Sequence, residues 1–141
     1  ILILALIGLG DAGYLTMKHL SGETPNCSIL QGCDIVTTSA YSEIFGIPVA
    51  AGGVVYYMTM AALMVAWFDR KKETFLRLAG LFSWAGIIAS AWFVYVQLGI
   101  LKAICLYCMG SAASSTAIFI LGQMILHKLN KNTAATKQHP A

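Results

Sequence analysis

Four long apolar stretches constrain this 141-residue chain more than any other feature of its sequence. They cover residues 1–20, 48–68, 75–100 and 104–127. Each approaches the roughly 20 residues that a helix needs to cross a bilayer, where lipid offers exposed backbone groups no hydrogen-bond partner. The sequence therefore predicts an all-α fold, an integral membrane four-helix bundle over residues 1–129. A polar, disordered tail is expected over residues 130–141.

The composition agrees with a membrane protein. The chain is 58% hydrophobic and 11% charged, whereas a soluble domain is nearer half apolar and a quarter charged. Residues 1–20 lack a basic leader and a small-residue cleavage site, so we expect a retained helix rather than a secretory signal. The net charge of +3 comes without the interleaved aromatic and basic residues of a nucleic-acid groove, and no nucleic-acid partner is expected.

The basic residues predict the orientation of the bundle. Seven of the nine Lys and Arg residues follow the second or the fourth stretch: Arg70, Lys71, Lys72, Arg77, Lys128, Lys131 and Lys137. Short basic loops stay in the cytoplasm, so the C-terminus is expected there. The loop over residues 21–47 then faces outward.

All four cysteines fall on that outer side, although they were not used to assign it. Cys27 and Cys33 lie in the outer loop, and Cys105 and Cys108 form a Cys-x-x-Cys pair at the head of the last stretch. Such a pair is typical of an exchangeable dithiol, and a helix N-terminus stabilises a thiolate. Disulfide chemistry also belongs to the outer compartment. Two pairs within reach of one another indicate a redox relay.

Two further features concern the helices and the outer loop. After Cys33, alternating apolar and polar residues up to Ile47 predict a short amphipathic lid helix on the bilayer surface. In the third stretch, Gly80, Ser83 and Gly86 form a face of small residues suited to close helix packing.

Asp11 lies in the middle of the first stretch, where a charge is costly. It is either a proton-handling acid or, as we favour from sequence, a protonated or locally paired acid facing the bundle.

Several motifs together resemble the vitamin K epoxide reductase family, most closely its bacterial branch, over nearly the whole chain. They are Gly13–Thr16, Cys27, Gly32–Val36, Ser39–Tyr41, Phe45–Pro48 and Cys105–Cys108. The resemblance implies a four-helix core around a quinone (ubiquinone, menaquinone or a related one). It also implies a quinone-dependent thiol/disulfide oxidoreductase in the bacterial inner membrane, with its active site on the periplasmic side.

The resemblance also implies roles for individual residues. Cys105 and Cys108 would be the active-site pair, with Cys108 facing the quinone, and Cys27 and Cys33 the shuttle pair. Cys33 would exchange with Cys105, and Cys27 would meet a reduced thioredoxin-like partner, so that disulfides form in exported proteins. Ser39, Tyr41 and Phe45 match quinone-side positions. Ala112 stands where animal members carry a Tyr, which favours quinone reduction over vitamin K epoxide.

Three alternatives stay open. A DsbB-like quinone-linked oxidase also has four spans and two cysteine pairs, although its Cys-x-x-Cys comes in the first outer loop. Four thiolates could instead bind a metal ion, but zinc sites use closer pairs than Cys27 and Cys33, and we expect no metal. Two inert disulfides could brace a scaffold, yet a Cys105–Cys108 bond closes too small a loop to stabilise much.

Overall fold

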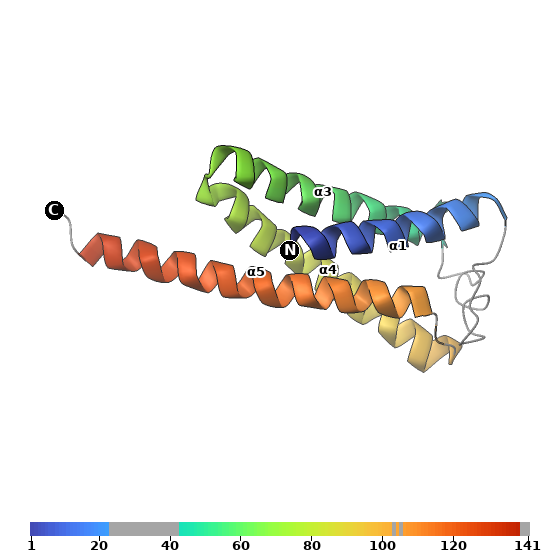
Figure 1. The fold of residues 1–141 in the computed structure, drawn as a ribbon. Helices are drawn as coiled ribbons and strands as arrows, with labels where there is room; N and C mark the ends of the chain where they lie inside the picture. The colour runs from blue at the N-terminus through green and yellow to red at the C-terminus, as the bar shows by residue number, and fades with distance from the viewer. Residues whose placement is uncertain (23–42, 103, 105, 139–141) are drawn as a thin grey trace.

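The computed structural model describes residues 1–22, 43–102, 104 and 106–138, and these form a bundle of four helices (Figure 1). The elements are α1 (Leu2–Leu20), β1 (Glu43–Ile44), β2 (Ile47–Pro48), α3 (Val49–Arg70), α4 (Glu73–Tyr95), the π-helical turn η2 (Val96–Leu101) and α5 (Leu106–Gln138). The predicted all-α membrane bundle is confirmed.

Three helical runs are long and apolar enough to cross a membrane: Val49–Arg70, Glu73–Leu101 and Leu106–Gln138. α1 is not among them: its 19 residues are enough in length, but Asp11 and Lys18 lower its mean hydropathy. α1 instead packs along α3 and α5, so it belongs to the same bundle.

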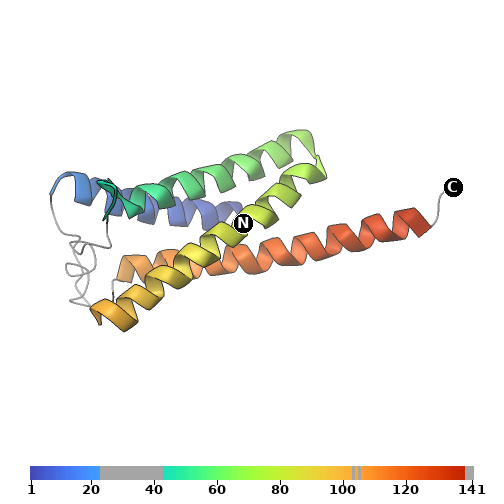
Figure 2. The ribbon, with the colours of Figure 1, turned by 180° about the vertical axis from the view of Figure 1, so that it is seen from behind.

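The helices alternate in direction, and each packs against two neighbours in the ring α1–α3–α4–α5. Figures 1 and 2 show that the last turn of α1, the first of α3, the end of α4 with η2, and the first of α5 lie at one end of the bundle. We call this the hairpin end, because β1 and β2 lie there. A buried core runs between the helices: Ala5, Ala12, Tyr57, Met60, Met64, Ala79 and Ile118.

Small residues allow the helices to approach closely. A Cβ at Gly8 would overlap the ring of Tyr57, and one at Gly86 would overlap the Tyr56 hydroxyl. Ser83 is fully buried on the same face of α4 as Gly86. The predicted small-residue face is therefore an interface, as expected where packing rather than hydrophobic burial holds membrane helices together.

The predicted lid helix is wrong for its described end. Residues 43–48 form a tight antiparallel hairpin in which Glu43 pairs with Pro48 and Ile44 with Ile47. Phe45 and Gly46 make its two-residue turn with φ of 53° and 78°, the left-handed values that such hairpin turns require. A helix does not accommodate those dihedral angles, and the remainder of the predicted lid lies outside the described residues.

The prediction of a disordered tail is also wrong for the described residues 130–138, because α5 continues as a helix to Gln138. Arg77 of α4 donates hydrogen bonds to Asn130 Oδ1 (2.8 Å) and to Thr133 Oγ1 (3.0 Å). These contacts attach the polar extension of α5 to its neighbour. Ala134 and Ala135 also favour helix, since alanine has the highest helix propensity.

Candidate redox site

Cys108 lies in the first turn of α5, which begins at Leu106, and its side chain is half-buried. This turn is at the hairpin end, where the free N–H groups of the helix and its dipole favour a negative charge. The fold therefore sets one thiol of the Cys-x-x-Cys pair at a position suited to thiolate chemistry.

Contacts between α1 and the residues around Cys108 fix this end of α5. The rings of Tyr14 and Tyr107 pack with centroids 5.1 Å apart, and the ammonium group of Lys18 lies 5.8 Å from the Tyr14 centroid. Tyr107 belongs to the Cys-x-x-Cys segment and Tyr14 to the Gly13–Thr16 motif, so two motifs far apart in the sequence meet here.

A second contact attaches the hairpin to α1. His19 Nε2 lies 2.6 Å from Glu43 Oε1. α1 ends before positions 23–42 and β1 begins after them, and both of these elements reach the hairpin end (Figure 1). The described residues on both sides of positions 23–42, which include Cys27 and Cys33, thus lie at the end where α5 begins.

One turn below Cys108, a polar cluster joins α1, α3 and α5. The hydroxyl of the buried Tyr57 donates to the Ser111 carbonyl oxygen (2.8 Å) and lies 2.9 Å from Ser111 Oγ. Asp11 Oδ2 lies 4.0 Å from the point that a Cβ on Gly110 would occupy. Among the described residues this carboxylate oxygen is buried and has no hydrogen-bond partner.

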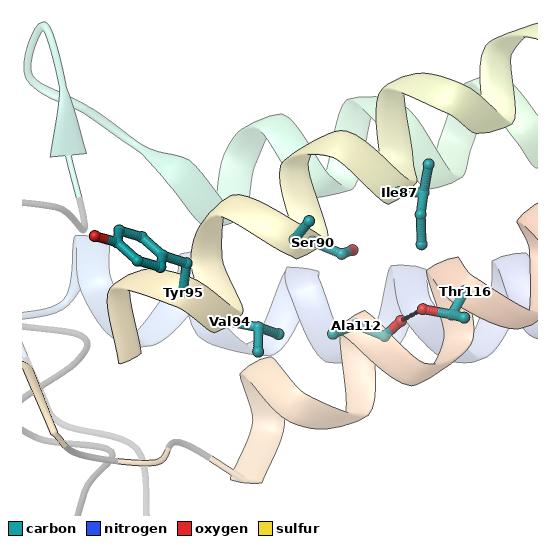
Figure 3. Close-up of a pocket in the computed structure, with 7 residues that line it drawn as sticks. Ile87, Ser90, Val94, Tyr95, Ala112 and Thr116 are labelled. Atoms are coloured by element: carbon teal, nitrogen blue, oxygen red, sulfur yellow. Dashed lines mark hydrogen bonds between the residues drawn. The ribbon is translucent and has the colours of Figure 1, made fainter. Parts of the chain in front are cut away.

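An apolar groove lies between α4 and α5. The groove has a volume of about 390 Å³ and is lined by Ile87, Ser90, Ala91, Val94, Tyr95, Ala112 and Thr116. In Figure 3, Ser90 and Ile87 of α4 lie opposite Ala112 and Thr116 of α5. The Thr116 hydroxyl donates to the Ala112 carbonyl oxygen (2.8 Å), which leaves the wall largely apolar.

Helix geometry relates Cys108 to both features. Residues three and four apart are neighbours on a helix surface. Ser111 therefore flanks Cys108 on the side of the polar cluster, and Ala112 flanks it on the side of the groove. The Cys108 position thus lies one helical turn before Ser111 of the polar cluster and before Ala112 of the groove wall.

Of the site residues predicted from sequence, the structure describes Cys108 and Phe45. Outside the described residues lie Cys27, Cys33, Ser39, Tyr41 and Cys105. Phe45 is described, and its side chain is fully exposed at the tip of the hairpin. Sequence reasoning missed the groove, although the spacing of Cys108, Ala112 and Thr116 along one side of a helix is a signal that could have found it.

Within residues 1–22, 43–102, 104 and 106–138, no three His, Cys, Asp or Glu side chains gather as a metal site requires. Three of the four cysteines lie outside these ranges. The four-thiolate alternative is therefore decided by metal analysis of the purified protein, in which one tightly bound zinc per chain would favour it.

Comparison with known proteins agrees with this arrangement. The thiol-disulfide oxidoreductase LTO1 of Arabidopsis thaliana is 33% identical over 119 residues, which cover 79% of this chain. The chain spans about a third of the length of that relative, since the matched region is 32% of it. Residues 1–122, which contain all four cysteines and end within α5, match the model of the vitamin K epoxide reductase family. The chain belongs to that family.

Proposed function

We propose that this chain is a membrane thiol–disulfide oxidoreductase. Electrons enter from a reduced thioredoxin-like protein at Cys27 and Cys33, pass by disulfide exchange to Cys105 and Cys108, and leave to a quinone. The observation that carries the proposal is the position of Cys108, in the first turn of α5 and one helical turn before Ala112 in the wall of an apolar groove. Family membership and the thiol-disulfide oxidoreductase relative support the same reaction class.

The groove fits the apolar part of a quinone. Its wall is formed mostly by apolar side chains, with Ser90, Tyr95 and Thr116 supplying hydroxyl groups, and it lies between two helices that are apolar enough to span the membrane. A lipid-soluble molecule therefore reaches it without crossing water. Ubiquinone and menaquinone are both of this chemistry.

The chain supplies the thiols, and the quinone is the two-electron acceptor. The Cys105 and Cys108 thiols give up two electrons and two protons, a disulfide forms between them, and the quinone leaves as the quinol. Exchange with the Cys27–Cys33 pair then restores the dithiol and oxidises the outer pair. Attack in each exchange is by a thiolate, and the helix N-terminus at Cys108 favours that form.

The proposal includes an orientation. The hairpin end faces the periplasm or an equivalent outer compartment, and the connection with Arg70, Lys71 and Lys72 faces the cytoplasm. The bacterial inner membrane provides both a quinone pool and an oxidising outer side. A DsbB-like oxidase performs a similar net reaction, but that alternative does not account for the family match over residues 1–122.

The test measures oxidation of a reduced thioredoxin-fold protein by the purified chain, with and without a short-tailed quinone. We expect oxidation only with quinone. Ala112→Trp fills the groove and should raise the KM for quinone severalfold. Ala113→Trp places the same indole on the exposed neighbouring face and should leave KM unchanged. Quinone-independent oxidation, or equal KM values for the two variants, would contradict the proposal.

A further inference from the structure

One exposed side of α5 changes from apolar to basic toward the end of its apolar run. Ile120 is 54%, Leu121 37% and Met124 56% exposed. Lys128 and Lys131 follow them, and both are exposed. These positions recur at intervals of three or four residues, so they form one continuous stripe along the helix.

The opposite side of α5 packs against α4, so the stripe faces away from the bundle. Leu126 occupies the space that a Cβ on Gly80 would need. Arg77 of α4 donates a hydrogen bond to Asn130 Oδ1 (2.8 Å). Leu126 and Asn130 are each two residues from Lys128, which places them about 200° away around the helix. The stripe therefore borders the lipid.

The two lysines of the stripe lie at the depth of lipid headgroups. At about 1.5 Å per residue, Lys128 is about 33 Å and Lys131 about 37 Å along the helix axis from Leu106, where α5 begins. The hydrocarbon core of a bilayer is about 30 Å thick, and the headgroup layers extend it to about 40–45 Å. Figures 1 and 2 show that α5 continues past the turn between α3 and α4. A span that enters the hydrocarbon at Leu106 brings both ammonium groups to the phosphates of the opposite leaflet.

The charge of these lysines is not neutralised within their own helix. Leu106–Gln138 contains no Asp or Glu. The turn between α3 and α4 differs, because Asp69 and Glu73 stand on either side of its three basic residues. Lys128 and Lys131 are three residues apart and thus neighbours on the helix surface, so both can contact a single phosphate group.

We propose that this stripe is a binding site for an anionic phospholipid. The phosphate lies between the ammonium groups of Lys128 and Lys131. One acyl chain follows Ile120, Leu121 and Met124 into the hydrocarbon. The site requires only that the bundle spans a bilayer, so it is separate from the thiol and quinone chemistry at the hairpin end.

Electrostatics sets the size of the expected effect. The attraction of one Lys or Arg to an anionic membrane surface corresponds to about a fivefold change in binding constant. Phosphatidylglycerol has a net negative headgroup, whereas phosphatidylcholine has none. With the same acyl chains on both lipids, a preference for the first measures the headgroup contact alone.

The test measures which lipid lies on the stripe. Trp67, Trp84 and Trp92 are replaced by phenylalanine, and Met124→Trp places a single indole one turn before Lys128. The protein is reconstituted in vesicles of mixed phosphatidylglycerol and phosphatidylcholine, in which one lipid or the other has brominated acyl chains. Bromine quenches the fluorescence of an indole that it contacts. We expect brominated phosphatidylglycerol to bind beside the indole at least about fivefold more strongly than brominated phosphatidylcholine.

Variants of the lysines assign the preference to this site. Lys128→Gln combined with Lys131→Gln should abolish it, and arginine at both positions should retain it, because the positive charge remains. Lys137→Gln is the matched control, since Lys137 is exposed, about 13 Å farther along the axis than Lys128 and about half a turn away around it. Quenching by brominated phosphatidylcholine in every variant checks that the bundle is inserted in the same way.

Equal binding of the two brominated lipids, or a preference that survives the double glutamine substitution, would overturn the proposal. Weak quenching by both lipids would also overturn it, because it would show that another protein, such as a second copy of this chain, covers the stripe. The measurement uses no quinone and no thiol, so failure of the proposed function would leave its result unchanged.

Discussion

Tyr57→Phe isolates the contribution of one hydroxyl to the contact between α3 and α5. The ring stays packed on Gly8 and beside Tyr56, whose centroid is 5.0 Å away, so only the hydroxyl contacts with Ser111 are lost. Each neutral hydrogen bond contributes about 0.5–1.5 kcal/mol net, and an unsatisfied buried group costs about 1–3 kcal/mol. Ser111 Oγ can turn to a carbonyl of its own helix, which lowers the penalty.

We therefore expect Tyr57→Phe to reduce the free energy of unfolding by about 1–2 kcal/mol, from one to two net hydrogen bonds. Equilibrium unfolding in mixed detergent micelles measures it. Tyr95→Phe is the matched control, because Tyr95 is 60% exposed and the same chemical change there should cost little. Equal stabilities for the two variants would refute the reasoning that the Tyr57–Ser111 contact joins the helices.

Three further predictions use the same structure. Gly8→Ala should destabilise the bundle by about 1–3 kcal/mol, because its Cβ overlaps the Tyr57 ring, whereas Gly10→Ala, with open space around it, should not; unfolding measurements compare the two. Arg77→Met removes the hydrogen bonds to the polar end of α5, so limited proteolysis should cleave that end faster, and unchanged cleavage would count against the contact. Cys27→Ala should slow oxidation of a folded protein partner more than oxidation of a small dithiol, and equal losses in the two assays would argue against a shuttle.

The bundle was predictable because hydropathy alone marks the long spans. In lipid, a helix satisfies the backbone hydrogen bonds within each span. The face of Ser83 and Gly86 was predictable for a related reason, since small residues at helical spacing have few other uses in a membrane. Cys108 at the head of α5 followed from where the last apolar stretch begins.

The errors have local physical causes. The alternation that indicated a lid helix up to Ile47 did not account for Phe45 and Gly46, whose positive φ values make a hairpin turn. The polar tail continues as a helix because Arg77, on the preceding helix α4, bonds to its side chains. The contact between Tyr57 and Ser111 depends on how the two helices are rotated about their axes. Membrane helices are only weakly amphipathic, so the sequence pattern does not reveal this rotation.

The central claim is that the outer cysteines exchange disulfides with the pair at the head of α5. Cys108→Ala tests it most directly, because the variant lacks the thiol that would resolve the exchange intermediate. Peptide mapping of this protein under non-reducing conditions should find a Cys33–Cys105 disulfide, and quinone reduction should be absent. Normal turnover, or a protein in which Cys33 and Cys105 never become linked, would contradict the relay.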